Sequence, residues 1–324
     1  MADGTGHADG FLFHCARFFN NEDWHVKNIQ LSGGLSFFVS FTGQWIMPLF
    51  FLLSGISSFY SLKAQPAGQY LGNRFRRLAV PFVFGTLVVL VPVQVWVERI
   101  SHGQFQGSFI EFYPRYFDGF YAFGGNFAWM GLHLWYLEIL FVLTLLTLPV
   151  LLFLKKEGPS RIISGMAGGM EKYKATFLFG VPVWLMEFLV SLQPDGAGRR
   201  DFGGWSALTY LVVFVLGFIL ASDSRFRTAI ARTRTASLIL AFLTASLIFV
   251  FPPDLSSFGP VIKSPASLFL RSFNSWFWLS AILGYGSTYL NFSNRLLTYS
   301  RTAVLPFYDS PSDHHCRRRF FYLP

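Results

Sequence analysis

Seven long apolar segments, each nearly free of charged residues, recur along the 324-residue chain. A helix that crosses a membrane needs about 20 mostly apolar residues, and these segments cover residues 35–62, 79–97, 130–154, 176–193, 205–222, 236–251 and 273–292. Two shorter apolar stretches, "FLFHCARFF" at 11–19 and "TAVLPFY" at 302–308, are typical of the end of a first span and the start of a last one. The pattern predicts an all-α, polytopic transmembrane helix bundle, with about seven full spans plus partial first and last spans, in one domain over residues 1–324.

The composition is typical of a membrane protein and argues against several other classes of protein. Hydrophobic residues make up 52% of the chain and charged residues only 13%, whereas soluble domains carry about 25% charged residues. The expected partner is therefore a lipid bilayer, and the net charge of +9 is not read as a nucleic-acid surface. Cys15 and Cys316, the two cysteines, give no disulfide framework and no metal-ligand spacing. No phosphate-binding or dinucleotide glycine motif is present, so no bound cofactor or metal is expected.

The distribution of Lys and Arg among the loops predicts the orientation of the bundle. Fifteen of these residues lie in the loops 63–78, 155–175, 223–235 and 293–301, and six lie in the alternate loops. Cytoplasmic loops carry the excess of Lys and Arg. We therefore expect the first set to be cytoplasmic, and residues 20–34 and 98–129 to lie outside.

A dense arginine cluster, "NRFRRLAVPF" at 73–82, lies at the cytoplasmic end of the span 79–97. One interpretation is positive-inside topology and contact with lipid headgroups. The other is a binding site for a phosphorylated ligand, because guanidinium groups bind phosphate oxygens in a two-pronged geometry. Arg74 and Arg77 are three residues apart and would share one face of a helix, with Arg76 pointing elsewhere. If they begin the helix, its N-terminus adds favourable partial positive charge.

Further polar residues inside apolar segments are candidates for chemistry. His14 lies in the first short stretch, where it is either a packed polar group or a base whose pKa near neutrality lets it accept a proton. The segment "NFAWMGLHLWYLE" at 126–138 is explained by an aromatic membrane-interface belt, or by a sugar site that uses His133 and neighbouring aromatic side chains. Glu187, within the span 176–193, is an acid that should pair with another polar group or line a cavity.

Four of these stretches together resemble the membrane-bound acyltransferase 3 family. They are "FHCARFFNNEDWHVKN" at 13–28, "WIMPLFFLLSGISSFYSL" at 45–62, "NRFRRLAVPF" at 73–82 and "GNFAWMGLHLWYL" at 125–137. Their order and content are similar to the branch of bacterial glucan-modifying acyltransferases, and the resemblance runs from about residue 11 to residue 308. It implies a polytopic enzyme of the bacterial inner membrane that takes an acyl group from cytoplasmic acyl-CoA and passes it to a hydroxyl, often on an exported or periplasmic carbohydrate.

The resemblance also implies roles for particular residues. Arg74 and Arg77 match the family's Arg-x-x-Arg, which is thought to hold the phosphates of CoA. His14 matches the family's first-span histidine, the expected general base. His133 and Trp135 match a recurrent motif that we assign to substrate binding.

The two ends depart from the family pattern. Residues 1–10, "MADGTGHADG", are polar where the family's first span carries an arginine, and the segment "DSPSDHHCRRR" at 309–319 ends the last apolar stretch. One set of codons permitted for residues 309–319, read with its first base omitted, encodes an apolar segment instead. The interpretation is a truncated or frameshifted gene end, with 1–10 and 309–324 outside the native bundle and little or no activity in this chain. The alternative for the basic segment is a natural terminus.

Two other function classes remain open from the sequence. A transporter or flippase would also use polytopic helices with intramembrane His and Glu, and an inactive fragment of the acyltransferase would explain the unusual ends. The Arg-x-x-Arg favours the enzyme over a generic carrier. The acyl group, the acceptor and the oligomeric state are not specified by the sequence.

Overall fold

A computed structural model describes residues 12–22, 25–173, 175–196, 198–200, 203–250 and 265–289. Within these ranges every regular element is a helix, and the sole strand-like feature is an isolated bridge between Phe120 and Phe127. The predicted all-α class is therefore confirmed. The predictions for residues 1–10, for the short apolar stretch 302–308 and for the tail 309–324 lie outside the described residues.

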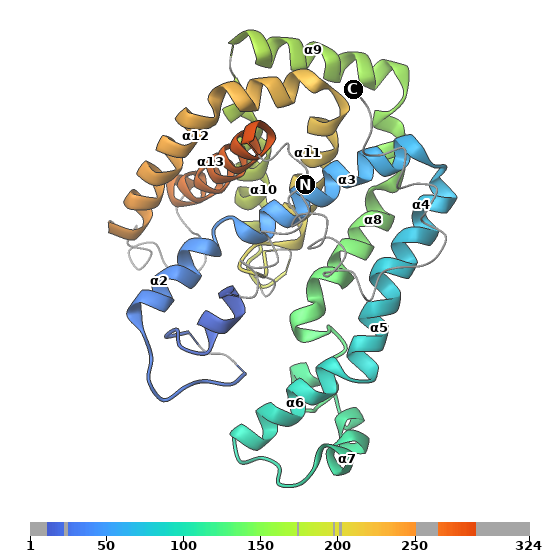
Figure 1. The fold of residues 1–324 in the computed structure, drawn as a ribbon, viewed down its shortest axis with the longest axis vertical. Coiled ribbons are helices and arrows are strands. Elements are labelled where there is room, and N and C mark those ends of the chain that lie inside the picture. The colour runs from blue at the N-terminus through green and yellow to red at the C-terminus, as the bar shows by residue number, and fades with distance from the viewer. Residues whose placement is uncertain are drawn as a thin grey trace.

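A short helical segment at 12–17 opens the described chain and is followed by the elements labelled in Figure 1. The α-helices are α2 (Gly33–Thr42), α3 (Ile46–Ala64), α4 (Ala67–Arg74), α5 (Val80–Leu87), α6 (Leu90–Ser101), α7 (Phe109–Phe112), α8 (Trp135–Leu154), α9 (Glu157–Tyr173), α10 (Gly180–Ser191), α11 (Ala207–Ser222), α12 (Ser224–Val250) and α13 (Pro265–Tyr289). A π-helical turn, η1 (Phe75–Ala79), joins α4 to α5. Short 3₁₀ turns are η2 (Tyr113–Phe117), η3 (Tyr121–Phe123), η4 (Leu132–Leu134) and η5 (Thr176–Phe179).

The helices account for the predicted membrane spans. Four helical stretches of the described chain are long and apolar enough to cross a membrane, at 33–64, 67–101, 132–154 and 224–250, and shorter apolar helices cover 176–191 and 207–222. The seventh predicted span falls on α13. The protein is thus an integral membrane bundle of α-helices.

Two glycines bring α3 and α11 into direct backbone contact. A Cβ atom at Gly55 would lie 1.9 Å from the carbonyl oxygen of Phe214, and a Cβ atom at Gly217 would lie 2.1 Å from the carbonyl oxygen of Leu52. Each helix therefore lays its backbone against the glycine of the other. Small residues at such positions let helices in lipid approach closely enough for extensive van der Waals contact.

A buried ion pair joins α10 to the loop before α11. The carboxylate of Glu187 is fully buried and accepts hydrogen bonds from the Arg200 guanidinium at 2.7 Å and the Thr209 hydroxyl at 2.5 Å. The expectation that Glu187 pairs with another polar group is confirmed. Breaking a buried pair leaves an uncompensated charge, so this contact fixes how the loop packs onto the bundle.

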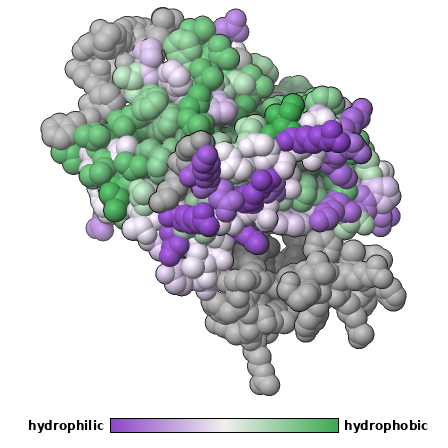
Figure 2. Space-filling view, turned by 90° about the horizontal axis from the view of Figure 1, so that it is seen from above, coloured by the Kyte–Doolittle hydropathy of each residue, from purple (hydrophilic) through white to green (hydrophobic). Residues whose placement is uncertain are grey.

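Three of the predicted loops rich in Lys and Arg gather at one end of the molecule, and the fourth, 293–301, lies outside the described residues. The α3–α4 junction, α9 and the start of α12 lie at the top of Figure 1, while α6 and α7 lie at the opposite end. At the top, Arg225 at the start of α12 binds Ser164 of α9 at 2.5 Å and the adjacent Asp223 at 2.7 Å. Figure 2 looks onto this end and shows hydrophilic side chains gathered between hydrophobic surfaces. This arrangement agrees with the grouping of loops by charge.

The assignment of this end to the cytoplasm gives the first testable prediction. In a chain with both native cysteines changed to serine, Ser160→Cys in α9 should resist an impermeant thiol reagent in intact cells. Ile110→Cys in α7 should react, because Ile110 is 82% exposed and lies at the other end. Labelling is read as a mass shift on a gel, with permeabilised cells as the control in which both positions must react. Labelling of Ser160→Cys in intact cells would reverse the orientation.

Candidate active site

Three histidines from distant parts of the chain come together at the lower end of the bundle. His14 lies in the helical segment 12–17, His25 in the loop that follows, and His133 in η4 before α8. His133 interacts electrostatically with both His14 and His25. The structure thus brings two predicted site residues, His14 and His133, into one cluster and adds His25, for which the sequence analysis assigned no role.

Helix α6 holds two of the three imidazole rings. Gln94 and Glu98 are four residues apart on α6 and therefore share one face of the helix. Nδ1 of His133 is hydrogen-bonded to Oε1 of Gln94, and Nδ1 of His25 is 2.7 Å from Oε2 of Glu98. Both rings are thus oriented by α6 through contacts of their Nδ1 atoms.

The Glu98 carboxylate is the centre of this arrangement. Glu98 is only 7% exposed, and the hydroxyl of Tyr121 donates to its two oxygens at 2.7 and 2.9 Å. Burial and the hydrogen bond to Glu98 raise the pKa of the Tyr121 phenol well above its ordinary value, so that it stays a donor. A carboxylate accepts hydrogen bonds and donates none. Nδ1 of His25 must therefore carry the proton of this contact.

The neighbouring Arg99 fixes the loop that supplies Tyr121. Its guanidinium lies 5.6 Å from the centre of the Tyr121 ring and donates to the Gly125 carbonyl at 2.7 Å and to Oδ1 of Asn126 at 2.9 Å. These contacts tie α6 to the 3₁₀ turn η3 and the residues after it. The side chains around Glu98 are thus positioned by a folded outer loop as well as by α6.

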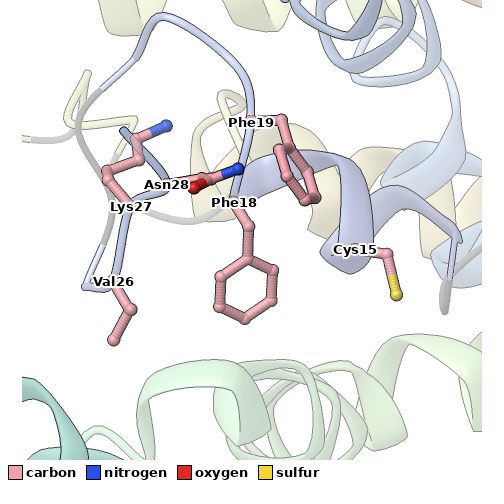
Figure 3. A pocket seen from close by; sticks show the side chains of 6 residues that line it. All are labelled: Cys15, Phe18, Phe19, Val26, Lys27 and Asn28. Carbon is pink, nitrogen blue, oxygen red and sulfur yellow. The ribbon is translucent and has the colours of Figure 1, made fainter. Parts of the chain in front are cut away.

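A largely apolar cavity of about 360 Å³ lies in the N-terminal segment that also carries His14 and His25, and its lining residues are shown in Figure 3: Cys15, Phe18, Phe19, Val26, Lys27 and Asn28. Cys15 and Val26 directly follow His14 and His25 in the chain. The Lys27 ammonium donates to the backbone carbonyls of Arg17 and Asn20, at 2.9 and 2.6 Å. The cavity therefore offers apolar surface within the segment that carries His14 and His25, and none of the three histidines is among its lining residues.

The arginine cluster lies at the other end of the same helical stretch, 67–101. Arg74 is the last residue of α4, and Arg77 lies in the π turn η1. The prediction that the cluster begins a helix is wrong, since α4 starts at Ala67. The prediction of a shared helical face also fails, because a π turn has i→i+5 hydrogen bonds and is wider than an α turn. The segment from Arg77 to Gln94 corresponds to about 25 Å of helical rise.

The two arginines have different surroundings. Arg74 is half-buried, donates to the Ser58 hydroxyl of α3 at 2.9 Å, and lies 5.4 Å from the centre of the Tyr70 ring. Arg76 and Arg77 are exposed. Arg74 is thus anchored in a polar network between α3 and α4, whereas the Arg77 side chain is exposed at the surface.

Trp135 belongs to the interior of the bundle. Its ring is 5.8 Å from Tyr210 of α11 and 6.4 Å from Phe51 of α3. Trp135 thus contacts α3 and α11, whereas His133 is hydrogen-bonded to Gln94 of α6. The substrate-binding role of Trp135 stays a prediction. In the described part of the chain, no three His, Cys, Asp or Glu side chains form a group that could hold a metal ion.

Comparison with known proteins gives a consistent result. The family model described as acyltransferase domain matches residues 10–305. Two similar curated proteins, from Escherichia coli strains K12 and SMS-3-5, are each named "Glucans biosynthesis protein C". Each is 22% identical over 320 residues, which cover 96% of this chain and 79% of the relative. No solved structure matches the chain.

Proposed function

Because this chain belongs to the acyltransferase 3 family and is a membrane acyltransferase, we propose that it moves an acyl group from cytoplasmic acyl-CoA to a hydroxyl of an exported or periplasmic carbohydrate. The name of the curated relatives supports a glucan as the acceptor. The inner membrane of a bacterium is the proposed location, since there a cytoplasmic donor and a periplasmic acceptor face the same bundle.

The observation that carries this proposal is the placement of two different polar sites on one helical stretch. Arg74 and Arg77 lie near its upper end, and Gln94 and Glu98 hold the histidine cluster near its lower end. Acyl-CoA is a long molecule with phosphates at one end and the thioester at the other. It can therefore bind the arginines through its phosphates while its thioester approaches the histidines.

The reaction needs one base and no covalent intermediate on the protein. His14 takes the proton of the acceptor hydroxyl, and the hydroxyl oxygen attacks the thioester carbonyl carbon. The carbon–sulfur bond breaks as the ester bond forms, and the CoA thiolate takes the proton back from the imidazolium. The apolar cavity lined by Cys15, Phe18 and Phe19 would hold the acyl chain.

The proposal is tested by acyl transfer with the purified full chain in lipid vesicles. Radiolabelled acetyl-CoA and a glucose oligosaccharide are supplied, and ester formation is followed by mass spectrometry. An ester that accumulates in proportion to the enzyme supports the proposal. Transport of the oligosaccharide or the acyl-CoA without a covalent product would replace it with a carrier function.

The role of the arginines gives the second testable prediction. Arg77→Ala should raise the KM for acyl-CoA about tenfold or more, since a hydrogen bond to a charged group contributes roughly 1.5–3 kcal/mol. The KM for the acceptor should not change. Arg74→Ala should have a similar effect and also lower the melting temperature, because it removes the contact with Ser58.

Arg76→Ala is the matched control, since Arg76 is an exposed arginine of the same π turn. It should leave the KM for acyl-CoA within about twofold of the unmodified chain, as expected for an exposed charge. Equal and small effects at all three arginines would leave them only a role in membrane orientation.

A further inference from the structure

Helix α9 runs across the upper end of the bundle in Figure 1 and carries exposed apolar side chains. We propose that α9 is an interfacial helix of the membrane: Ile162 and Met166 insert among lipid acyl chains, and the basic residues around them bind the headgroups of anionic phospholipids. This surface and its partner go beyond the proposed transfer reaction and do not depend on it.

Two rows of side chains determine how α9 faces the rest of the protein. Ile163 and Ala167 form the row that is buried against the bundle. The residues that follow them, Ser164 and Gly168, face Arg225 of α12. The Ser164 hydroxyl accepts a hydrogen bond from the guanidinium at 2.5 Å, and a Cβ atom at Gly168 would lie 3.1 Å from the same group. One flank of α9 is thus packed against α12.

Ile162 and Met166 form a third row on the opposite flank. Each directly precedes a residue of the buried row, so its side chain projects about 100° away from that row, on the side away from α12. Ile162 is 68% exposed and Met166 is 44% exposed. They are four residues apart and therefore form one apolar strip along the helix. The strip points sideways from the bundle, where lipid surrounds a membrane protein.

The connection to α8 places α9 at the depth of the membrane surface. Leu152 and Phe153, in the last turn of α8, are 38% and 54% exposed and continue its exposed apolar surface. Lys155 and Lys156 follow directly. Long basic side chains at the end of a membrane helix extend their charge to the interface. Since α9 begins at Glu157, it starts at the level at which the chain leaves the hydrocarbon.

The charge of this segment favours an anionic membrane surface as the partner. Residues 155–175 contain five Lys and Arg and two Glu, a surplus of three positive charges. The Arg161 side chain is 83% exposed on the outward side of α9. A helix with an apolar side and a basic side is the type that lies in the membrane interface, where anionic headgroups attract Lys and Arg. The protein is embedded in a bilayer, so this partner is adjacent to the strip.

The position of the strip is tested with nitroxide labels on the full chain in lipid vesicles. In a chain with both native cysteines changed to serine, a label is attached to Ile162→Cys, Met166→Cys or Arg161→Cys. Electron paramagnetic resonance measures collisions with oxygen, which concentrates in lipid, and with a neutral nickel chelate, which stays in water. Arg161→Cys is the matched control, because its label lies on the same helix and points outward.

We expect the labels at Ile162→Cys and Met166→Cys to collide more often with oxygen than with nickel, and the label at Arg161→Cys to show the reverse. More frequent collisions with nickel at all three positions would place the strip in water and overturn the proposal. Rare collisions with both reagents at Ile162→Cys and Met166→Cys would show that protein, such as a second copy of the chain, covers the strip. That result would also overturn the proposal.

The headgroup preference is tested with a fluorophore on Met166→Cys, which brominated acyl chains quench on contact. Brominated phosphatidylglycerol and brominated phosphatidylcholine are compared in mixed vesicles of the two lipids, and the anionic lipid should quench more strongly. Lys156→Gln together with Arg161→Gln should lower this preference about fivefold or more, since each basic residue near an anionic surface contributes about fivefold in binding. Equal quenching by both lipids before these changes, or a preference that the changes leave intact, contradicts headgroup binding by α9.

Discussion

Gly217→Ala is expected to destabilise the bundle by about 3 kcal/mol or more, at the upper end of the cost of overpacking. The new Cβ atom would lie 2.1 Å from the Leu52 carbonyl oxygen and 3.0 Å from its carbonyl carbon. These are backbone atoms of a helix, so a side-chain rotation cannot relieve the clash and α3 must move away from α11. The effect is measured as the melting temperature and the yield of monodisperse protein in detergent.

Gly55→Ala should have a similar effect, because it makes the reciprocal clash with Phe214. The control is Gly165→Ala in α9, where a Cβ atom would meet nothing within 4 Å. Alanine in the middle of a helix is favoured over glycine by roughly 0.5–1 kcal/mol, so this variant should be as stable as the unmodified chain or more stable. A Gly217→Ala protein with an unchanged melting temperature would show that α3 and α11 are not closely packed in the membrane.

The helices were predictable from apolar length, but their ends were not. The span predicted at 236–251 begins at Ser224 in the structure, and the span predicted at 273–292 begins at Pro265. Helices continue beyond the apolar part of a sequence, because backbone hydrogen bonding does not stop where polar side chains begin. A hydropathy window reports only the part that suits the membrane interior.

Helix α9 was missed because the sequence analysis treated residues 155–175 as a loop. Its buried residues Ile163, Ala167 and Met170 are spaced by four and three positions. This spacing is the pattern of an amphipathic helix with one apolar face. The signal was present in the sequence, but a search for long apolar segments does not detect it.

Two of the three histidines in the cluster were predictable, for a different reason. His14 and His133 stand out as ionisable residues in apolar stretches, whereas His25 lies in a polar loop, where histidines are common. Its contacts with Glu98 and Tyr121 join residues 73 and 96 positions apart in the chain. No local pattern reports contacts at such separations. One local signal was overlooked: Gln94 and Glu98 are polar residues four apart near the end of an apolar segment.

The three-residue spacing of Arg74 and Arg77 did not predict the directions of their side chains, because the local helix geometry is not that of an α-helix. The expectation of a shared face assumed an α-helix, and the structure places Arg77 in a π turn. The turn leaves Arg74 directed to Ser58 and Arg77 exposed. Spacing therefore predicted which residues gather at this end of the bundle, but not which way each one points.

His14→Ala is expected to reduce kcat by about a hundredfold to ten-thousandfold, the usual contribution of a general base. The KM for acyl-CoA and the melting temperature should change little, because His14 is exposed and is not part of the core. The measurement is the initial rate of ester formation at saturating donor and acceptor. A kcat above one tenth of the original value would exclude His14 as the base.

The neighbouring imidazoles make a double variant necessary for this test. His133 interacts electrostatically with both His14 and His25, so a second ring could accept the proton when His14 is lost. If His133 takes over, the residual kcat of His14→Ala should fall at least another tenfold when His133→Gln is added. If no second ring accepts the proton, the double variant should keep the residual kcat of His14→Ala.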